Sequence, residues 1–386
     1  MTSRRLLHAV AALVSLASLA AANARAAAPT PLDSGRFSFP GSLITPSNAI
    51  SAGFALADRY ADDVANNPAA RIERGVIASP QLLRVSRQDL SAANREFEQR
   101  FASVDFAGAT ISLPMRHVDV SLFAWQPALR AERESYTIGN KNALSSPGRI
   151  TNDATLRELR GGIALGFGGG GLRFGVSGEF DHRDDDYQSL ETSGSPQSGT
   201  REAAFSGDAI GGGLGLTWQR HPELKHGWRV GTAVHAVGAL AATGTSVATL
   251  LADTTKTNIK VTRDATWQAG ASARWSLSTL SGVYASVGAR SAEKWDSFAL
   301  ETKLASDWGL GIDYRDPETP YAFRAGIGQE VQPGAPEPRA ATLGLGFSWY
   351  SGDTIFDIGL THRTISRGDA PKNSDDRLVG SVRIKL

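Results

Sequence analysis

The sequence of 386 residues contains no cysteine, has little charge imbalance, and has no long apolar run beyond its first residues. The lack of cysteine excludes disulfides, so stability must come from packing and hydrogen bonds. Lysine and arginine (40) nearly balance aspartate and glutamate (39), which leaves no basic footprint for a nucleic-acid partner. After residue 26, no apolar run reaches the length of about 18 residues that a spanning helix requires.

The first 26 residues have the form of a secretory signal peptide. Arg4 and Arg5 precede an apolar stretch over 6–22, and Ala24-Arg25-Ala26 then forms an A-x-A cleavage site. The small residues that follow the apolar stretch favour a signal peptide over a membrane-anchoring helix. We therefore expect export and cleavage after Ala26, which leaves three classes: a periplasmic protein, a secreted protein or an outer-membrane β-barrel.

Alternation of apolar and polar residues is the dominant pattern in the rest of the chain. In 171–181, 298–315, 341–350 and 354–363, apolar side chains occupy one face, and charged or small side chains occupy the other. Such segments fit strands with one face toward lipid and the other toward a lumen. The 41 glycines recur within alternating segments, where they relieve crowding on an inner face and permit curvature.

Fourteen alternating segments predict the fold class, an all-β, transmembrane antiparallel barrel over residues 74–386. Long connections alternate with short ones, as expected for outer loops and periplasmic turns. An even count places both ends of the barrel in the periplasm, and twelve or sixteen strands stay open as alternatives. The predicted strands are 74–86, 104–114, 117–127, 154–167, 171–183, 203–219, 227–242, 257–276, 282–291, 298–315, 320–331, 340–350, 353–365 and 376–386.

Two further features fit the outer membrane of a Gram-negative bacterium. The final segment, 376–386, alternates up to Leu386 and resembles the recognition strand of outer-membrane assembly. The barrel-assembly machinery is therefore an expected partner during biogenesis, and outer-membrane lipids and lipopolysaccharide are expected around the folded barrel. Tryptophans near segment ends predict an interfacial girdle: Trp125, Trp218, Trp228, Trp267, Trp275, Trp308 and Trp349.

Residues 27–73 do not alternate, and we interpret them as an N-terminal arm and hatch. The stretch 27–50 is rich in proline and serine, and 51–67 has weak helical spacing that Pro68 ends. A barrel of fourteen strands is wider than its own side chains can fill, so a plug is physically plausible. The alternative is a periplasmic arm outside the barrel.

The stretch ADRYADDVANNPAAR, residues 57–71, carries a family resemblance. An acidic pair, Asp62-Asp63, a short spacer and Asn67-Pro68-Ala69 stand just before the first predicted strand. This arrangement resembles the FadL/TodX family of outer-membrane transporters of hydrophobic compounds. The resemblance implies a hatch inside a fourteen-stranded barrel, passive movement of long-chain fatty acids or aromatic hydrocarbons, and sideways exit through an opening made by an inward strand kink.

The acidic pair is open to two interpretations. Asp62 and Asp63 could form a general acid/base pair, but neighbouring residues on a helix point about 100° apart and would not share a site. We favour a structural role in which one acid pairs with a lumen arginine and pins the hatch. The candidate arginines are Arg173, Arg274, Arg315, Arg324 and Arg383.

The expected ligand is a hydrophobic small molecule, which needs an apolar path. The candidates for that path are apolar residues of the arm, and packing of the plug against the wall explains them equally well. They are Phe37, Phe39, Leu43, Ile44, Phe54 and Leu56.

No catalytic residue, cofactor or metal site is predicted. The acids of FDHRDDD, 180–186, lack the spacing of a calcium loop and are interpreted as a solvated hairpin tip. His235 faces the lumen on a predicted strand, but no serine partner is indicated. The sequence therefore predicts passive uptake of hydrophobic compounds by a non-enzyme. The alternative is a non-transporting barrel with a structural, secretion or assembly role.

Overall fold

The computed structural model describes residues 64–70, 75–88, 95–98, 100–102, 105–115, 118–138, 148–169, 171–192, 199–221, 225–250, 253–292, 294–295, 300–301, 304–315, 318–331, 338–367 and 370–385. Within these ranges, no helix is both long and apolar enough to cross a membrane. Residues 64–70 form turns, and nearly all of the remaining described residues form β-strands.

The strand segments belong to one antiparallel sheet in which several segments continue one another along a single barrel strand. In wall order they are β1 (Gly75–Gln88); β2 (Arg95–Glu98), β3 (Arg100–Ala102) and β4 (Asp105–Pro114); β5 (Val118–Ile138); β6 (Gly148–Gly169); β7 (Leu172–Thr192); β8 (Gly199–Arg220); β9 (Trp228–Val237) and β10 (Leu240–Leu250); β11 (Asp253–Arg263) and β12 (Thr266–Ser276); β13 (Ser281–Arg290) and β14 (Lys294–Trp295); β15 (Leu300–Glu301) and β16 (Ala305–Arg315); β17 (Tyr321–Val331); β18 (Pro338–Ser351); β19 (Thr354–Arg367); and β20 (Ala370–Lys385).

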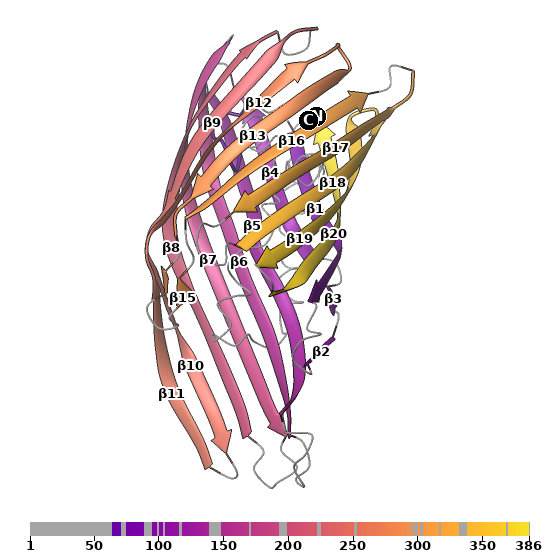
Figure 1. Ribbon diagram of the computed structural model, residues 1–386. Helices are drawn as coiled ribbons and strands as arrows, with labels where there is room; N and C mark the ends of the chain where they lie inside the picture. Colours follow the sequence, from indigo (N-terminus) through magenta and orange to yellow (C-terminus); the bar gives the residue numbers. More distant parts are fainter. Residues whose placement is uncertain are drawn as a thin grey trace.

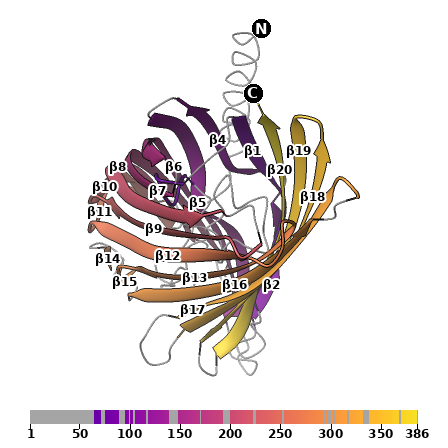
Figure 2. The same ribbon diagram turned by 90° about the horizontal axis from the view of Figure 1, so that it is seen from above.

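The sheet closes into a barrel because its last strand pairs with its first. Along that seam, pairs run from Gly75↔Lys385 to Gln88↔Asn373, and Figure 2 looks down into the ring of strands. The described segments make up fourteen barrel strands, so the predicted fold class and the predicted count are confirmed. Closure leaves no unpaired sheet edge to be satisfied in lipid.

The outer face of the barrel is apolar, and the inner face is polar, as the alternation predicted. On β7, Phe174 and Phe180 are exposed on the outside, whereas Arg173, Glu179 and Asp181 are buried on the inside. The same alternation continues through β16, β18 and β19. Apolar side chains toward lipid and charged side chains toward the lumen are the arrangement that a transmembrane barrel requires.

Several strands on one side of the barrel extend well past this apolar band. Figure 1 shows β7, β10 and β11 reaching far from the end where the C-terminus lies, while β17–β20 stop near mid-height. The outward residues of β11 between Thr254 and Lys260 are polar. The stretch 180–186, predicted as a hairpin tip, instead lies inside the long strand β7. Above a membrane both strand faces are polar, so the apolar–polar alternation that marks a strand is lost there.

The tryptophans of the predicted girdle lie on the outer surface of the barrel, with one exception. Trp218 (54 % exposed) packs edge-on against Trp228, with ring centroids 4.4 Å apart. Trp125 was assigned to the girdle wrongly, because its side chain is fully buried inside the barrel. The other girdle residues on the outer surface are Trp267, Trp275, Trp308 and Trp349.

Candidate functional site

Of the predicted site residues, Asn67, Pro68 and Ala69 belong to the described segment 64–70. All seven residues of this segment are buried, and the side chains and backbone that contact them belong to strands β5 to β9. The remaining predicted site residues lie outside the described residues: Phe37, Phe39, Leu43, Ile44, Phe54, Leu56, Asp62 and Asp63.

Asn67 and Pro68 form a tight turn that is closed by hydrogen bonds to the carbonyl and side-chain oxygens of Asn67. The Ala70 N–H donates to the Asn67 carbonyl (2.8 Å), and the Ala69 N–H donates to Asn67 Oδ1 (2.9 Å). The first bond closes a β-turn and the second an Asx-turn, with asparagine first and proline second, as such turns prefer. A turn therefore forms at these residues, and it presents the Asn67 amide to the wall.

Polar groups of the wall hold this turn from two sides. Asn67 Nδ2 donates to the Leu216 carbonyl and to Thr217 Oγ1, both at 3.3 Å. From β7, Arg173 Nε donates to the Ala69 carbonyl at 3.4 Å, and the same guanidinium pairs with Asp119 of β5. Three strands therefore contribute to one short turn.

A row of three glycines makes room for the turn on the inner wall. Gly166, Gly175 and Gly215 pair side by side across β6, β7 and β8. A Cβ added at Gly175 would overlap the backbone of Pro68, one at Gly215 would lie 3.0 Å from Pro68 Cδ, and one at Gly166 would lie 3.3 Å from the Pro68 oxygen. We call these three residues the glycine row. It works as a groove because it carries no side chains.

A buried histidine connects the wall to the residue before the turn. His235 of β9 lies with Nδ1 2.6 Å from Glu179 Oε1 and with Nε2 2.7 Å from the Asn66 carbonyl oxygen. The side chains of His235 and Glu179 are each only 1 % exposed. Ser177 Oγ donates to the same Glu179 oxygen at 2.7 Å. Gly213, which pairs with His235 across the ladder, leaves space for the imidazole.

This serine does not make a catalytic arrangement. In a hydrolytic triad the base contacts the nucleophile, and the carboxylate orients the base from its far side. Here Ser177 hydrogen-bonds to the carboxylate, and the far ring nitrogen of His235 faces a backbone carbonyl. The geometry of these three residues is that of a structural connection between strands and the segment 64–70.

An apolar cluster lies on the other side of the segment. Val64 and Ala65 pack with Phe123, Trp125 and Ala164 of β5 and β6, and all five are buried. The Arg160 guanidinium lies over the Trp125 ring, 5.4 Å from its centroid. Such a contact is favourable where it is shielded from water. The segment is therefore held by apolar packing as well as by hydrogen bonds.

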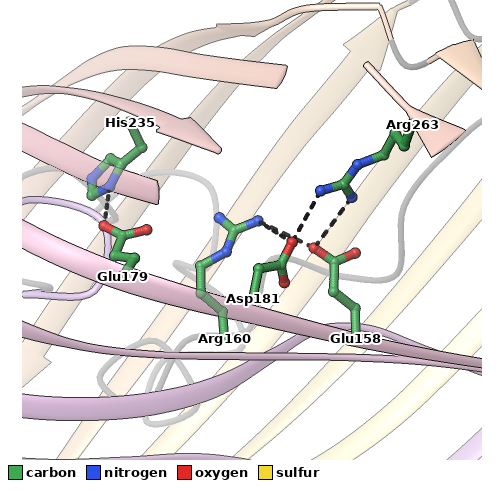
Figure 3. A network of polar contacts seen from close by, with 6 residues as sticks. All are labelled: Glu158, Arg160, Glu179, Asp181, His235 and Arg263. Atoms are coloured by element: carbon green, nitrogen blue, oxygen red, sulfur yellow. Dashed lines mark hydrogen bonds and ion pairs between the residues drawn. The ribbon is translucent and has the colours of Figure 1, made fainter. Parts of the chain in front are cut away.

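A second polar cluster lies farther along the same wall. Figure 3 shows Arg160 and Arg263 directed at the carboxylates of Asp181 and Glu158, next to the separate His235–Glu179 pair. Arg263 is 3.1 Å from Asp181, and Arg160 is 3.1 Å from Glu158. These charges come from β6, β7 and β11 and neutralise one another within the wall, as buried charges require.

The wall itself changes register beside the apolar cluster. The ladder between β4 and β5 reaches Gly108↔Trp125, and the next described pairing of β5 on this side, with β2, starts at Glu98↔Arg133. On its other side, β5 bulges between Trp125 and Ala128, where Pro127 supplies no N–H. Between these two described pairings, β3 lies against the same side of β5.

The arginines proposed to pin the hatch have other described partners. Arg173 holds the Ala69 carbonyl and Asp119, Arg274 lies 3.5 Å from Asp313, and Arg324 (3.7 Å) and Arg383 (3.3 Å) both lie near Asp357. Arg315 is exposed and stacks on Tyr350. Arg173 is thus the one candidate with a described contact to the segment 64–70.

Sequence reasoning missed the glycine row and the His235–Glu179 pair. The signal for the row was present, since Gly166, Gly175 and Gly215 occupy inward positions of alternating strands. These glycines form a row only because the pairing register of β6, β7 and β8 places them side by side, and the sequence alone does not give that register.

The whole barrel is similar to solved structures of outer-membrane channels. A toluene transporter of Ralstonia pickettii, TbuX, aligns with 90 % of this chain and 98 % of its own at a TM-score of 0.59 and 16 % identity. The toluene transporter TodX of Pseudomonas putida aligns over 88 % and 98 % at 0.58 and 15 % identity. The fold is that of the FadL/TodX channels. A FadL homologue of Pseudomonas aeruginosa agrees, at 0.55 and 11 % identity over 93 % of this chain and 99 % of that one.

The likeness to FadL/TodX channels is therefore one of fold. No protein-family model matches the sequence, and no curated protein matches it. The expected resemblance to this family is confirmed by the shared barrel architecture.

Proposed function

We propose that this protein is an outer-membrane channel for the passive uptake of hydrophobic small molecules, long-chain fatty acids or aromatic hydrocarbons. In this proposal, residues 27–73 form a hatch that closes the barrel, and Asn67-Pro68-Ala69 anchor it. The observation that carries the proposal is the buried turn of residues 67–70, seated on the glycine row in a barrel with the FadL/TodX fold. Toluene transporters are among the proteins with this fold.

The interior supports a closed channel for apolar compounds over an open aqueous pore. Charges of both signs on the wall are paired with one another, as in the cluster of Glu158, Arg160 and Asp181. An ion-selective pore would need rings of like charge that face an aqueous lumen.

The test is uptake in a Gram-negative strain that lacks its own hydrophobic-compound channels. Cells that make the protein should take up radiolabelled oleate or toluene faster than cells with an empty vector, and uptake of a small sugar should not change. The control is a heat-modifiable band on a gel, which shows that the barrel is folded in the outer membrane. Equal entry of both hydrophobic compounds with and without a folded barrel would contradict the proposal. A co-purifying secretion partner would then favour the alternative role.

A further inference from the structure

Both ring nitrogens of His235 face hydrogen-bond acceptors. Nδ1 lies 2.6 Å from a carboxylate oxygen of Glu179, and Nε2 lies 2.7 Å from the backbone oxygen of Asn66. The Asn66 carbonyl can only accept, so Nε2 must carry a hydrogen. If Glu179 is ionised, Nδ1 must carry one as well. A neutral imidazole has a single N–H and cannot satisfy both acceptors.

We propose that His235 and Glu179 form a proton-dependent latch, in which the imidazolium form of His235 fixes the segment 64–70 to the barrel wall. With the extra proton, Nδ1–H donates to Glu179 and Nε2–H donates to Asn66. The ion pair is fully buried, so both bonds are charge-assisted and shielded from water. The latch deepens the proposed function and rests on it, because it regulates the segment that is proposed to close the channel.

Loss of that proton breaks one of the two bonds. If the hydrogen stays on Nε2, two lone pairs face each other between Nδ1 and Glu179. If it stays on Nδ1, two lone pairs face each other between Nε2 and Asn66. Either result replaces a buried hydrogen bond with a repulsive contact and leaves polar groups unsatisfied. The segment is therefore bound while the pair holds this proton and released once the proton is lost.

The groups around the pair fit this assignment. From β6, Arg160 adds a positive charge to the same inner wall, next to the pair (Figure 3). On β7 itself, Ser177 donates to the same oxygen of Glu179, as expected for a carboxylate acceptor. From β8, Gly213 adds no side chain, and the segment contributes the Asn66 carbonyl. Glu179 is thus the acid that faces His235, and Arg160 is the nearby cation.

Two variants separate the latch from simple packing. In Glu179→Gln the amide N–H can donate to Nδ1, while Nε2–H donates to Asn66, so a neutral histidine satisfies both partners. This variant should hold the segment at high pH. His235→Ala removes the contact to Asn66 at every pH. The matched control is His182→Gln, because His182 also pairs with an acid (Asp208, 2.6 Å) but lies on the exposed surface of β7.

The readout is thiol labelling of Ala65→Cys, which is possible because the chain has no native cysteine. Ala65 is buried in the segment, so labelling reports its release. Purified full-length barrels in detergent are labelled from about pH 6 to about pH 10, a range that includes the ordinary titration of histidine. Each rate is divided by the rate of the Glu179→Gln variant at the same pH, so that the pH dependence of the thiol itself cancels.

The ratio for the parent barrel should stay near one at low pH and rise about tenfold at high pH, as expected for the loss of one hydrogen bond to a charged group. The His182→Gln control should follow the parent, and His235→Ala should label fast throughout. A ratio that does not change with pH would overturn the proposal. If His235→Ala does not fold, the comparison of the parent with Glu179→Gln still decides.

A second measurement tests the protonation state directly. Nitrogen NMR of histidine-labelled protein at neutral pH should show a buried imidazolium that is absent from His235→Ala and from Glu179→Gln. A neutral His235 in the parent would overturn the latch. These readouts do not depend on transport. A pH-dependent latch in a barrel without uptake would refute the proposed function alone, and uptake without the latch would refute this inference alone.

Discussion

The two walls of this barrel are alike outside and different inside. On the wall of β6–β9, the glycine row and His235 contact the segment 64–70. On the wall of β17–β20, Asp357 accepts from Ser381 (3.0 Å) and Arg383 (3.3 Å), so this network is made of wall residues alone. Both walls carry the same kind of apolar side chains toward lipid.

This difference separates two uses of an inner face. On the β17–β20 wall, the polar side chains named here satisfy one another. The β6–β9 wall has a groove of glycines and a histidine directed at a backbone carbonyl. These features are completed only when the segment 64–70 is bound. Contact with lipid determines the outer side chains of both walls. The inner side chains differ because one wall contacts the segment 64–70 and the other contacts its own polar residues.

The largest effect is expected on the self-contained wall. Asp357→Asn leaves Arg324 and Arg383 without their carboxylate and should destabilise the barrel by about 3 kcal/mol, as when a buried ion pair loses one partner. The measurement is urea unfolding in lipid vesicles. The control is Asp353→Asn in the exposed turn before β19. Unchanged labelling of Ala65→Cys in the folded fraction should accompany the loss, and a released segment would contradict the independence of the two walls.

A charge on the lipid face should cost the same on both walls. Leu345→Arg on β18 and Val176→Arg on β7 each place arginine among exposed apolar residues, and each should destabilise the barrel by about 2–4 kcal/mol near the centre of the bilayer. Asn258→Arg, on the outward face of the polar extension of β11, should have no such cost. Unfolding in vesicles again measures the change. A cost on only one wall would show that the outer faces are not equivalent.

Filling the glycine row should displace the segment without breaking the barrel. Gly175→Val introduces side-chain atoms where Pro68 and Ala69 lie, and such overpacking costs about 1–3 kcal/mol. We expect higher single-channel conductance in planar bilayers and faster labelling of Ala65→Cys. The matched control is Gly178→Val on the same strand, because Gly178 is exposed on the outside and its Cβ would meet open space. Equal conductance of the two variants would argue against a groove.

The smallest effect is expected from trimming the turn itself. Asn67→Ala removes the hydrogen bonds to Leu216, Thr217 and the Ala69 N–H, and should weaken the docking of the segment by about 1 kcal/mol. Hydrogen–deuterium exchange of the peptide that contains 64–70 measures this, with Asn258→Ala on exposed β11 as control. Exchange should rise in 64–70 and stay unchanged in β17–β20.

The sequence predicted the membrane-embedded part of the barrel because lipid imposes a strict rule. Every second residue of a strand faces hydrocarbon, so β7, β16, β18 and β19 show their faces directly in the alternation. The rule ends at the edge of the apolar band. The outer part of β7 was therefore predicted as a loop, although residues 184–192 continue the strand.

The inner site was predictable only where it depends on local chemistry. Asn67 before Pro68 predicts a turn from two adjacent residues. The pairing of Glu179 with His235 spans 56 positions, and the glycine row spans three strands. Both depend on the register between strands, which alternation does not specify. Trp125 was placed in the girdle only because it lies near the end of a predicted segment, although its side chain lies inside.

The turn lies close in sequence to the barrel seam, and this has a mechanical consequence. Ala70 stands five residues before Gly75, which pairs with both the last strand and β4. Five extended residues reach at most about 18 Å. A segment released from the wall therefore stays covalently connected to the seam by a short stretch of chain. Because of this connection, its effective concentration near the glycine row remains high. Reopening and reclosing can then occur many times within one folded molecule.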